Sequence, residues 1–184
     1  RLAAVHDDLQ RLLAKALLPA LTAVPLEDLR HLRVECSGAE GDVSFVRRVA
    51  QGRLDIVGHA VRRRSGATDA APTETGLLFD LPDILTLGTS SNGPGGGRML
   101  AIHEPGVLAQ AMMAGLDTVA APSELTALGQ VADDRLAALL EGLRSFEVDL
   151  STQRRRLHER IDSIQGEIAR RYRDGEASID SLLN

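Results

Sequence analysis

Two segments of the chain carry nearly the same polar residues at the same spacing, Glu-x3-Ser-x2-Arg-x3-Gln-x3-Asp. The first set is Glu40, Ser44, Arg47, Gln51 and Asp55, and the second is Glu147, Ser151, Arg154, His158 and Asp162. His158 stands where the pattern has glutamine. At about 100° per residue of an α-helix, each set falls within a stripe roughly 80° wide. Each set therefore predicts one polar face of one long helix.

The apolar residues around these stripes predict how the two helices pack. One heptad row in each segment is entirely apolar, namely Val43, Ala50 and Val57 in the first and Leu143, Leu150, Leu157 and Ile164 in the second. The other row of each seam is interrupted by a glutamate and an arginine of the repeated set, where a coiled coil normally has apolar residues. The sequence predicts a mainly α fold, an antiparallel helical hairpin in which two long helices form a coiled coil.

The rest of the chain divides around these two helices. We predict an N-terminal helix within residues 1–25, the first coiled-coil helix at 26–64, an irregular linker region with short elements at 65–130 and the second coiled-coil helix at 131–184. Gly38 and Gly41 each disfavour helix by up to ~1 kcal/mol relative to Ala, which leaves room for a break at 37–41. Within the linker region we expect a flexible glycine-rich loop at 88–98, a short strand at 98–103 and a short helix at 107–115.

Composition and charge exclude several classes of protein. Aromatic residues make up only 2% of the chain, which disfavours a β-sandwich or barrel. No apolar run approaches the ~20 residues of a membrane span. The net charge of −5 argues against broad nucleic-acid binding. Cys36 has no second cysteine to pair with, which fits a reducing compartment. We therefore expect a cytoplasmic protein with no membrane and no direct nucleic-acid partner.

The sequence shows no group of residues suited to catalysis. The loop GPGGGR lacks the Gly-Lys-Ser/Thr ending of a phosphate-binding loop, and no GxSxG motif frames a serine nucleophile. The five histidines are scattered, with no HxxxH or CxxC pair that would hold a metal ion. We therefore expect neither enzyme activity nor a bound metal.

The residues by themselves leave three interpretations of the repeated set open. In an antiparallel pair, Glu40 would face Arg154 while Glu147 faces Arg47, giving internal salt bridges that fix the register; Glu40 is also spaced to close a capping box with Ser37. Alternatively, the stripes are solvated helix faces. In the third interpretation they form a ligand site, because arginine suits phosphate and the guanine edge while carboxylates accept from guanine N–H donors. The residues alone favour the structural interpretation slightly.

The doubled pattern resembles that of the RsiG family of actinobacterial anti-sigma factors. Further segments agree with that family: DLRHL at 28–32, VSFVRRVAQGRLDI at 43–56, LPDIL at 81–85 and EIARRYRDGEASIDSLL at 167–183. The resemblance implies a cytoplasmic helical hairpin that binds a dimer of cyclic di-GMP across its coiled coil. The loaded form is expected to sequester a WhiG-type sigma factor, which controls sporulation genes in filamentous members.

The resemblance also assigns the ligand contacts, residue by residue. They are expected at Glu40, Ser44, Arg47, Gln51, Asp55, Glu147, Ser151, Arg154, His158 and Asp162. His158 departs from the family pattern and, when protonated, would favour phosphate. The alternative function is a ligand-independent structural coiled-coil adaptor. The run Arg62, Arg63 and Arg64 fits a solvated helix face or a sigma-factor contact, because no interleaved aromatic residues support nucleic-acid binding.

Overall fold

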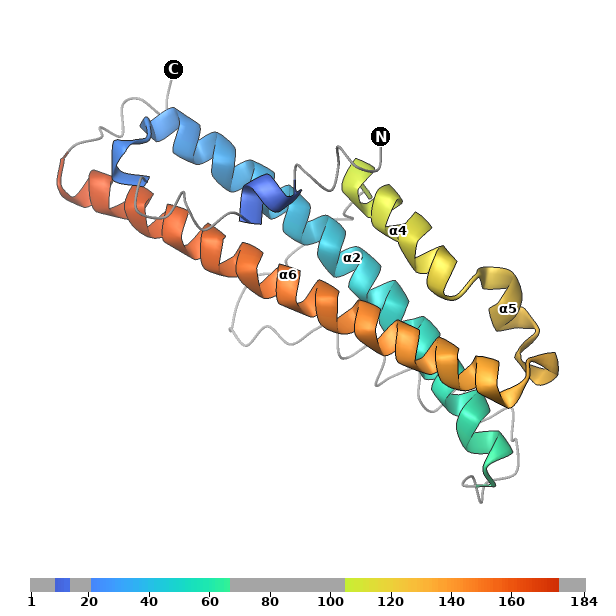
Figure 1. Cartoon of the computed structure of the whole chain (residues 1–184). Coiled ribbons are helices and arrows are strands. Elements are labelled where there is room, and N and C mark those ends of the chain that lie inside the picture. The colour runs from blue at the N-terminus through green and yellow to red at the C-terminus, as the bar shows by residue number, and fades with distance from the viewer. Residues whose placement is uncertain (1–8, 14–20, 67–104, 176–184) are drawn as a thin grey trace, which may run out of the picture.

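Two long antiparallel α-helices dominate the structure, a computed structural model of which residues 9–13, 21–66 and 105–175 are described (Figure 1). Helix α2 spans Leu26–Arg64 and helix α6 spans Asp133–Arg173. Arg64 contacts Asp133 at one end of the pair, and Arg30 donates to the Tyr172 hydroxyl at the other. The predicted helical hairpin is confirmed. The loop expected at 88–98 and the strand expected at 98–103 lie outside the described residues.

Charge at the helix ends supports both long helices. Each has two acidic residues in its first turn and three arginines in its last, which complements the partial charges at the ends of a helix. The break considered at 37–41 is absent, since α2 is continuous there, and a capping box between Ser37 and Glu40 is therefore wrong. Cys36, Ala39 and Val43 are buried around this stretch, and their packing outweighs the low helix propensity of glycine.

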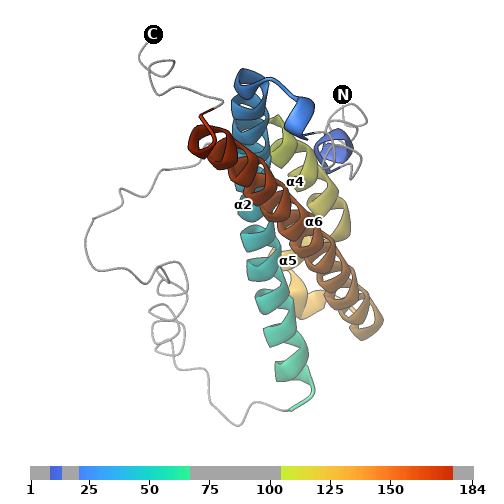
Figure 2. The same cartoon turned by 90° about the vertical axis from the view of Figure 1, so that its left-hand side faces the viewer.

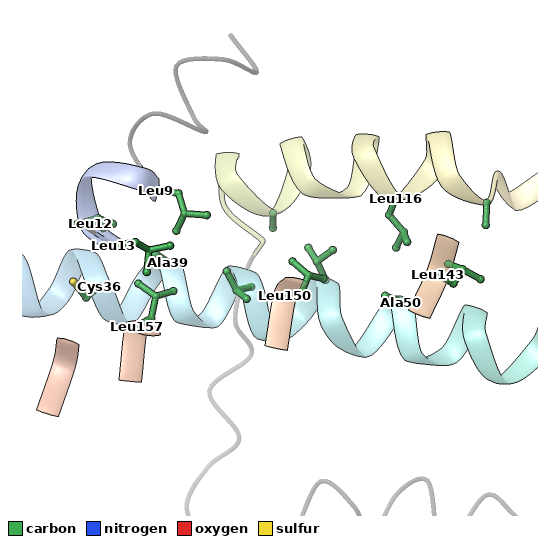
Figure 3. Packing of buried hydrophobic residues seen from close by; sticks show 14 of the residues in the cluster. Leu9, Leu12, Leu13, Cys36, Ala39, Ala50, Leu116, Leu143, Leu150 and Leu157 are labelled. Atoms are coloured by element: carbon green, nitrogen blue, oxygen red, sulfur yellow. The ribbon is translucent and has the colours of Figure 1, made fainter. Parts of the chain in front are cut away.

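The core lies along the seam between α2 and α6. Both apolar heptad rows predicted from the sequence are buried there, with Val43, Ala50, Val57, Leu143, Leu157 and Ile164 at 0% exposure and Leu150 at 3%. The second rows border this core with half-buried residues such as Leu54, Val61, Leu140 and Ile161. Figure 3 shows Ala50, Leu143, Leu150 and Leu157 between the helices. The Glu and Arg positions of the two repeated sets therefore lie at the edge of this buried apolar core.

Short helices cover one side of this hairpin (Figure 2). Helix α4 (Val107–Val119) packs against α2 and α6, and α5 (Pro122–Thr126) and η3 (Leu128–Gln130) lead from it to the start of α6. The helix that the sequence predicts at 107–115 is therefore present and extends four residues further, to Val119. Ala109 and Leu116 bury the inner face of α4.

A short N-terminal segment also adds to the core. Residues 9–13 are helical and bury Leu9, Leu12 and Leu13 beside α2 (Figure 3), and η2 (Leu21–Ala23) precedes α2. The remaining positions of the predicted N-terminal helix lie outside the described residues. In the part of the chain that the structure describes, no helix combines the length and apolarity needed to cross a membrane.

Candidate functional site

The first of two polar clusters at the seam is centred on Glu40 of α2. Its Oε1 atom accepts hydrogen bonds from Ser44 Oγ at 2.6 Å and from Arg154 Nε of α6 at 3.0 Å. His158 Nε2 of α6 lies 3.2 Å from the same oxygen. Arg154 Nε also donates to Ser44 Oγ at 2.9 Å. This cluster therefore combines the first two positions of one repeated set with the third and fourth positions of the other.

The second cluster repeats this arrangement with the helices exchanged. Glu147 Oε1 of α6 accepts from Ser151 Oγ at 2.9 Å, from Arg47 Nη1 of α2 at 3.1 Å and from Gln51 Nε2 of α2 at 3.2 Å. Gln51 thus occupies the place that His158 takes in the first cluster. The two clusters are related by an approximate two-fold axis that passes between the antiparallel helices.

The cross-helix pairs are the ones that the sequence predicted. Glu40 faces Arg154, and Glu147 faces Arg47, so the two internal salt bridges expected of an antiparallel register are confirmed. Both glutamates are about one-fifth exposed, at 20% and 19% of their side chains. Such half-buried pairs set the register of the helices more than they add to stability.

The surroundings of Glu40 keep its carboxylate ionised. Burial raises the pKa of this group, but the hydrogen bonds from Ser44 and Arg154 and the charges of His158 and Arg154 together outweigh burial, so the pKa is lowered from its ordinary value. Glu40 is therefore negatively charged at neutral pH and holds Arg154 by a charge-assisted hydrogen bond.

Both arginines keep unused hydrogen-bond donors. Arg154 donates only through Nε, so both of its terminal amino groups have no acceptor among the described residues. Arg47 donates through Nη1, and its Nε is buried without a hydrogen-bond partner there. The side chains are 40% and 24% exposed, so solvent or a ligand reaches them. A planar guanidinium with free donors at a partly dry site suits a phosphate or the acceptor edge of a base.

The last position of each set lies outside the clusters. Asp55 and Asp162 are exposed and make no hydrogen bond or ion pair within residues 9–13, 21–66 and 105–175. Each follows the fourth position of its set by one helical turn, so the two carboxylates lie toward opposite ends of the hairpin. The structure thus joins the other eight predicted residues into two clusters and leaves these carboxylates beside them.

Two buried charges on α2 that sequence analysis missed hold α4 on the hairpin. Asp42 Oδ1 and Oδ2 accept from the backbone N–H groups of Gly106 at 2.9 Å and Ala109 at 3.2 Å, at the start of α4. Arg53 donates to the Ala120 carbonyl at 2.8 Å and pairs with Asp117 at 2.7 Å, at its end. The negative charge of Asp42 complements the partial positive charge at the start of α4, and the positive charge of Arg53 complements the partial negative charge at its end.

The position of this clamp gives the hairpin two different sides. Asp42 lies about 200° around α2 from Glu40, so α4 is attached on the side away from the polar clusters. Two opposite charges three turns apart, flanked by apolar positions, were the available signal in the sequence. This pattern did not predict the clamp, since nothing in the sequence of α2 indicates that another helix packs against Asp42 and Arg53.

Other groups in the described residues do not extend the site. No three His, Cys, Asp or Glu side chains within 9–13, 21–66 and 105–175 are placed to hold a metal ion. Cys36 is fully buried, and burial raises the pKa of its thiol despite the nearby Arg160. A thiol of this kind is a weak nucleophile and packs as an apolar group.

Comparison with known proteins identifies a matching family. A family model described as RsiG-like matches residues 15–85 and 122–184, more than half of the chain. The matched residues include α2, α6 and both repeated sets, whereas α4 falls in the unmatched segment between them. No curated protein matches the chain significantly.

Proposed function

The chain belongs to the RsiG-like family of anti-sigma factors, and from this premise we propose that it binds cyclic di-GMP between α2 and α6 and, when loaded, sequesters a WhiG-type sigma factor in the cytoplasm. The family is regulatory rather than enzymatic, and an anti-sigma factor acts by binding a sigma factor. The proposal adds the identity of the ligand, the site and the type of sigma factor.

The observation that carries the proposal is the pair of half-exposed arginines with unused donors. Arg47 and Arg154 occupy equivalent places in two clusters related by an approximate two-fold axis. Their free amino groups would donate to phosphate oxygens or to the O6/N7 edge of guanine. The exposed carboxylates of Asp55 and Asp162, one turn beyond the clusters, would accept from guanine N1–H and N2–H2. A dimer of cyclic di-GMP carries phosphates and guanines in a matching repeated arrangement.

The ligand would act on the packing of the two helices. Without it, each arginine is held by a glutamate of the opposite helix. Ligand phosphates would compete for these guanidinium groups, while Ser44, Ser151, Gln51 and His158 would supply further hydrogen bonds. Because every cluster draws on both helices, binding would fix the separation and register of α2 and α6. The sigma factor would then recognise the fixed hairpin. Because coupling between two binding events is reciprocal, bound sigma factor would in turn tighten the binding of cyclic di-GMP.

A second function is favoured by the completeness of the clusters. The four charges at the seam already neutralise one another in pairs without any ligand. This favours a structural coiled-coil adaptor that binds its partner independently of a nucleotide. The two functions differ in one measurable respect, which is whether the affinity for the partner depends on cyclic di-GMP.

Calorimetric titration of cyclic di-GMP into the protein, with and without a WhiG-type sigma factor, tests the proposal. Cyclic di-AMP serves as the control ligand. We expect binding specific for the guanine nucleotide, at two molecules per chain, that becomes tighter when the sigma factor is present. Partner binding that is equally strong without any nucleotide would favour the adaptor. Absence of nucleotide binding under both conditions would refute the assignment of the site.

A further inference from the structure

A hollow at the C-terminal end of α2 has no role in the function proposed above. Ile56, His59, Ala60 and Arg63 of α2 line one side of it, and Leu128 and Gly129 of η3 line the other. Its volume is about 410 Å³, and it opens to solvent. The hollow lies where α2 approaches the connection from α4 to α6 (Figure 1).

The walls of the hollow are fixed by hydrogen bonds. Arg64 Nη1 lies 2.6 Å from Asp133 Oδ1 at the start of α6, and Arg64 Nη2 donates to the Leu128 carbonyl at 2.7 Å. The same amino group donates to the Gly129 carbonyl at 3.1 Å. Arg64 therefore ties the end of α2 to η3, so the hollow is already formed before any partner arrives.

The surface of the hollow combines apolar and cationic groups. Leu128 in its lining is buried, whereas Ile56 is 51% exposed and is one of four large apolar side chains exposed to this degree in the described residues. Arg63 and His59 are exposed and have no acidic partner within the described ranges. The adjacent Arg64 differs, since it pairs with Asp133. Arg63 and the exposed Ile56 together suit a ligand that carries both apolar and carboxylate groups.

We propose that this hollow receives an acidic amphipathic helix of the sigma factor, an inference that rests on the proposed function. An apolar side chain of that helix packs on Ile56 and Leu128, and its carboxylates face Arg63 and His59. Nucleic acid fits less well, because no aromatic residue lines the hollow.

The position of the hollow links it to the nucleotide site. Asp55 is the residue before Ile56, and His59 follows it by one helical turn on α2. A helix seated in the hollow therefore lies beside the last residue of the polar stripe, at the edge of the proposed nucleotide site. This proximity would let the binding of one partner strengthen the binding of the other.

Binding of the sigma factor to the full chain, measured at saturating cyclic di-GMP, tests the proposal. We expect Ile56→Asp and Arg63→Glu each to weaken the complex about tenfold or more, as truncation of a central interface residue does. Cyclic di-GMP binding in the absence of the sigma factor is expected to stay within about twofold of wild type, since neither side chain belongs to the clusters. Helix content, measured by circular dichroism, is expected to be unchanged because both side chains are exposed.

Two matched variants control for surface charge. Val34→Asp changes another exposed apolar residue of α2, and Arg173→Glu reverses the charge of an exposed arginine at the other end of the hairpin. Both are expected to bind the sigma factor like wild type.

Wild-type affinity in the Ile56 and Arg63 variants overturns the docking proposal while leaving the nucleotide site intact. A change in self-association, measured by sedimentation, without a change in sigma binding would overturn it in favour of a second copy of the chain. Wild-type protein that binds no sigma factor refutes the proposed function and the docking proposal together.

Discussion

Arg154 Nε of α6 donates to Glu40 Oε1 of α2 across 3.0 Å, although the two residues are 114 positions apart in the sequence. The equivalent pair, Arg47 and Glu147, joins the same two helices in the opposite sense. Each polar cluster is thus assembled from both copies of the repeated set. Neither helix carries a complete cluster, so helix pairing and the proposed ligand binding depend on the same contacts.

Replacing Arg47 by alanine is expected to weaken cyclic di-GMP binding by about 30-fold or more, because a charge-assisted contact of a partly buried site costs about 2 kcal/mol when truncated. Helicity is expected to remain largely unchanged. Arg48→Ala is the matched control, since Arg48 is exposed, adjacent in sequence and outside the clusters. Calorimetry measures both affinities. Equal loss in the two variants would point to general electrostatics instead of a defined site.

A double-mutant cycle tests the pairing of the helices. Glu40→Gln and Arg154→Gln, alone and together, are expected to show a coupling of about 0.5–1 kcal/mol in the free energy of unfolding, measured in urea. The cycle between Glu40 and Arg47, which lie on one helix and share no contact, is expected to give less. Coupling that is stronger within α2 than across the helices would contradict the antiparallel register.

His158 is expected to make nucleotide binding depend on pH. Histidine gains a positive charge when it is protonated, and at this position the charge would lie beside the proposed phosphate site. Glu40 stays ionised in this range, because its pKa is lowered from its ordinary value. Affinity for cyclic di-GMP should therefore rise toward pH 6 in the wild type.

Exchanging the side chains between the clusters isolates this effect. His158→Gln gives the first cluster the glutamine that the second cluster has, and should make the affinity for cyclic di-GMP less dependent on pH. Gln51→His places a histidine in the equivalent position beside Glu147, and this variant should steepen the profile. Calorimetric titrations between pH 6 and 8 measure all three proteins. A profile that persists in His158→Gln would locate the titrating group elsewhere.

Gly106 is expected to be intolerant of a side chain. A Cβ atom at this position would lie 2.6 Å from Asp42 Oδ2, so Gly106→Ala must displace the carboxylate that caps α4. We expect a loss of about 1 kcal/mol or more in the free energy of unfolding, comparable to the loss of a helix cap. Gly38→Ala, at an open position within α2, should instead raise stability by up to ~1 kcal/mol. Urea denaturation distinguishes the two. A neutral Gly106→Ala variant would show that the cap contributes little.

Glu167 is expected to make stability depend on acid pH. Hydrogen bonds from Arg170 and Arg171 lower its pKa to about 2, and Arg171 also donates to the Leu21 and Thr22 carbonyls. Because the folded-state pKa lies below the unfolded one, the contribution is complete above about pH 4.5 and is lost as the pH falls toward 2. Thermal unfolding of wild type and Glu167→Gln should differ in Tm at pH 6 and converge on acidification. A difference that does not vary with pH would exclude this ion pair as its source.

Much of the hairpin follows from local patterns in the sequence. Heptad spacing placed Val43, Ala50 and Val57 in the seam, and they are buried. The matched phase of the two polar sets led to the pairing of Glu40 with Arg154. These features are predictable because helical periodicity fixes which residues share a face, and an antiparallel pair then has few registers that bury its apolar rows.

Other features depend on packing between distant segments. Continuity of α2 through Gly38 is decided by the burial of its neighbours, which outweighs the local preference of glycine. The same holds for the clamp of Asp42 and Arg53 on α4 and for the hollow between α2 and η3. The sequence alone determined the two helices and the residues on their facing sides. Tertiary structure decided which residues of one repeated set join those of the other in each cluster, and which side of the hairpin α4 leaves uncovered. These contacts arise only when segments far apart in the chain pack together.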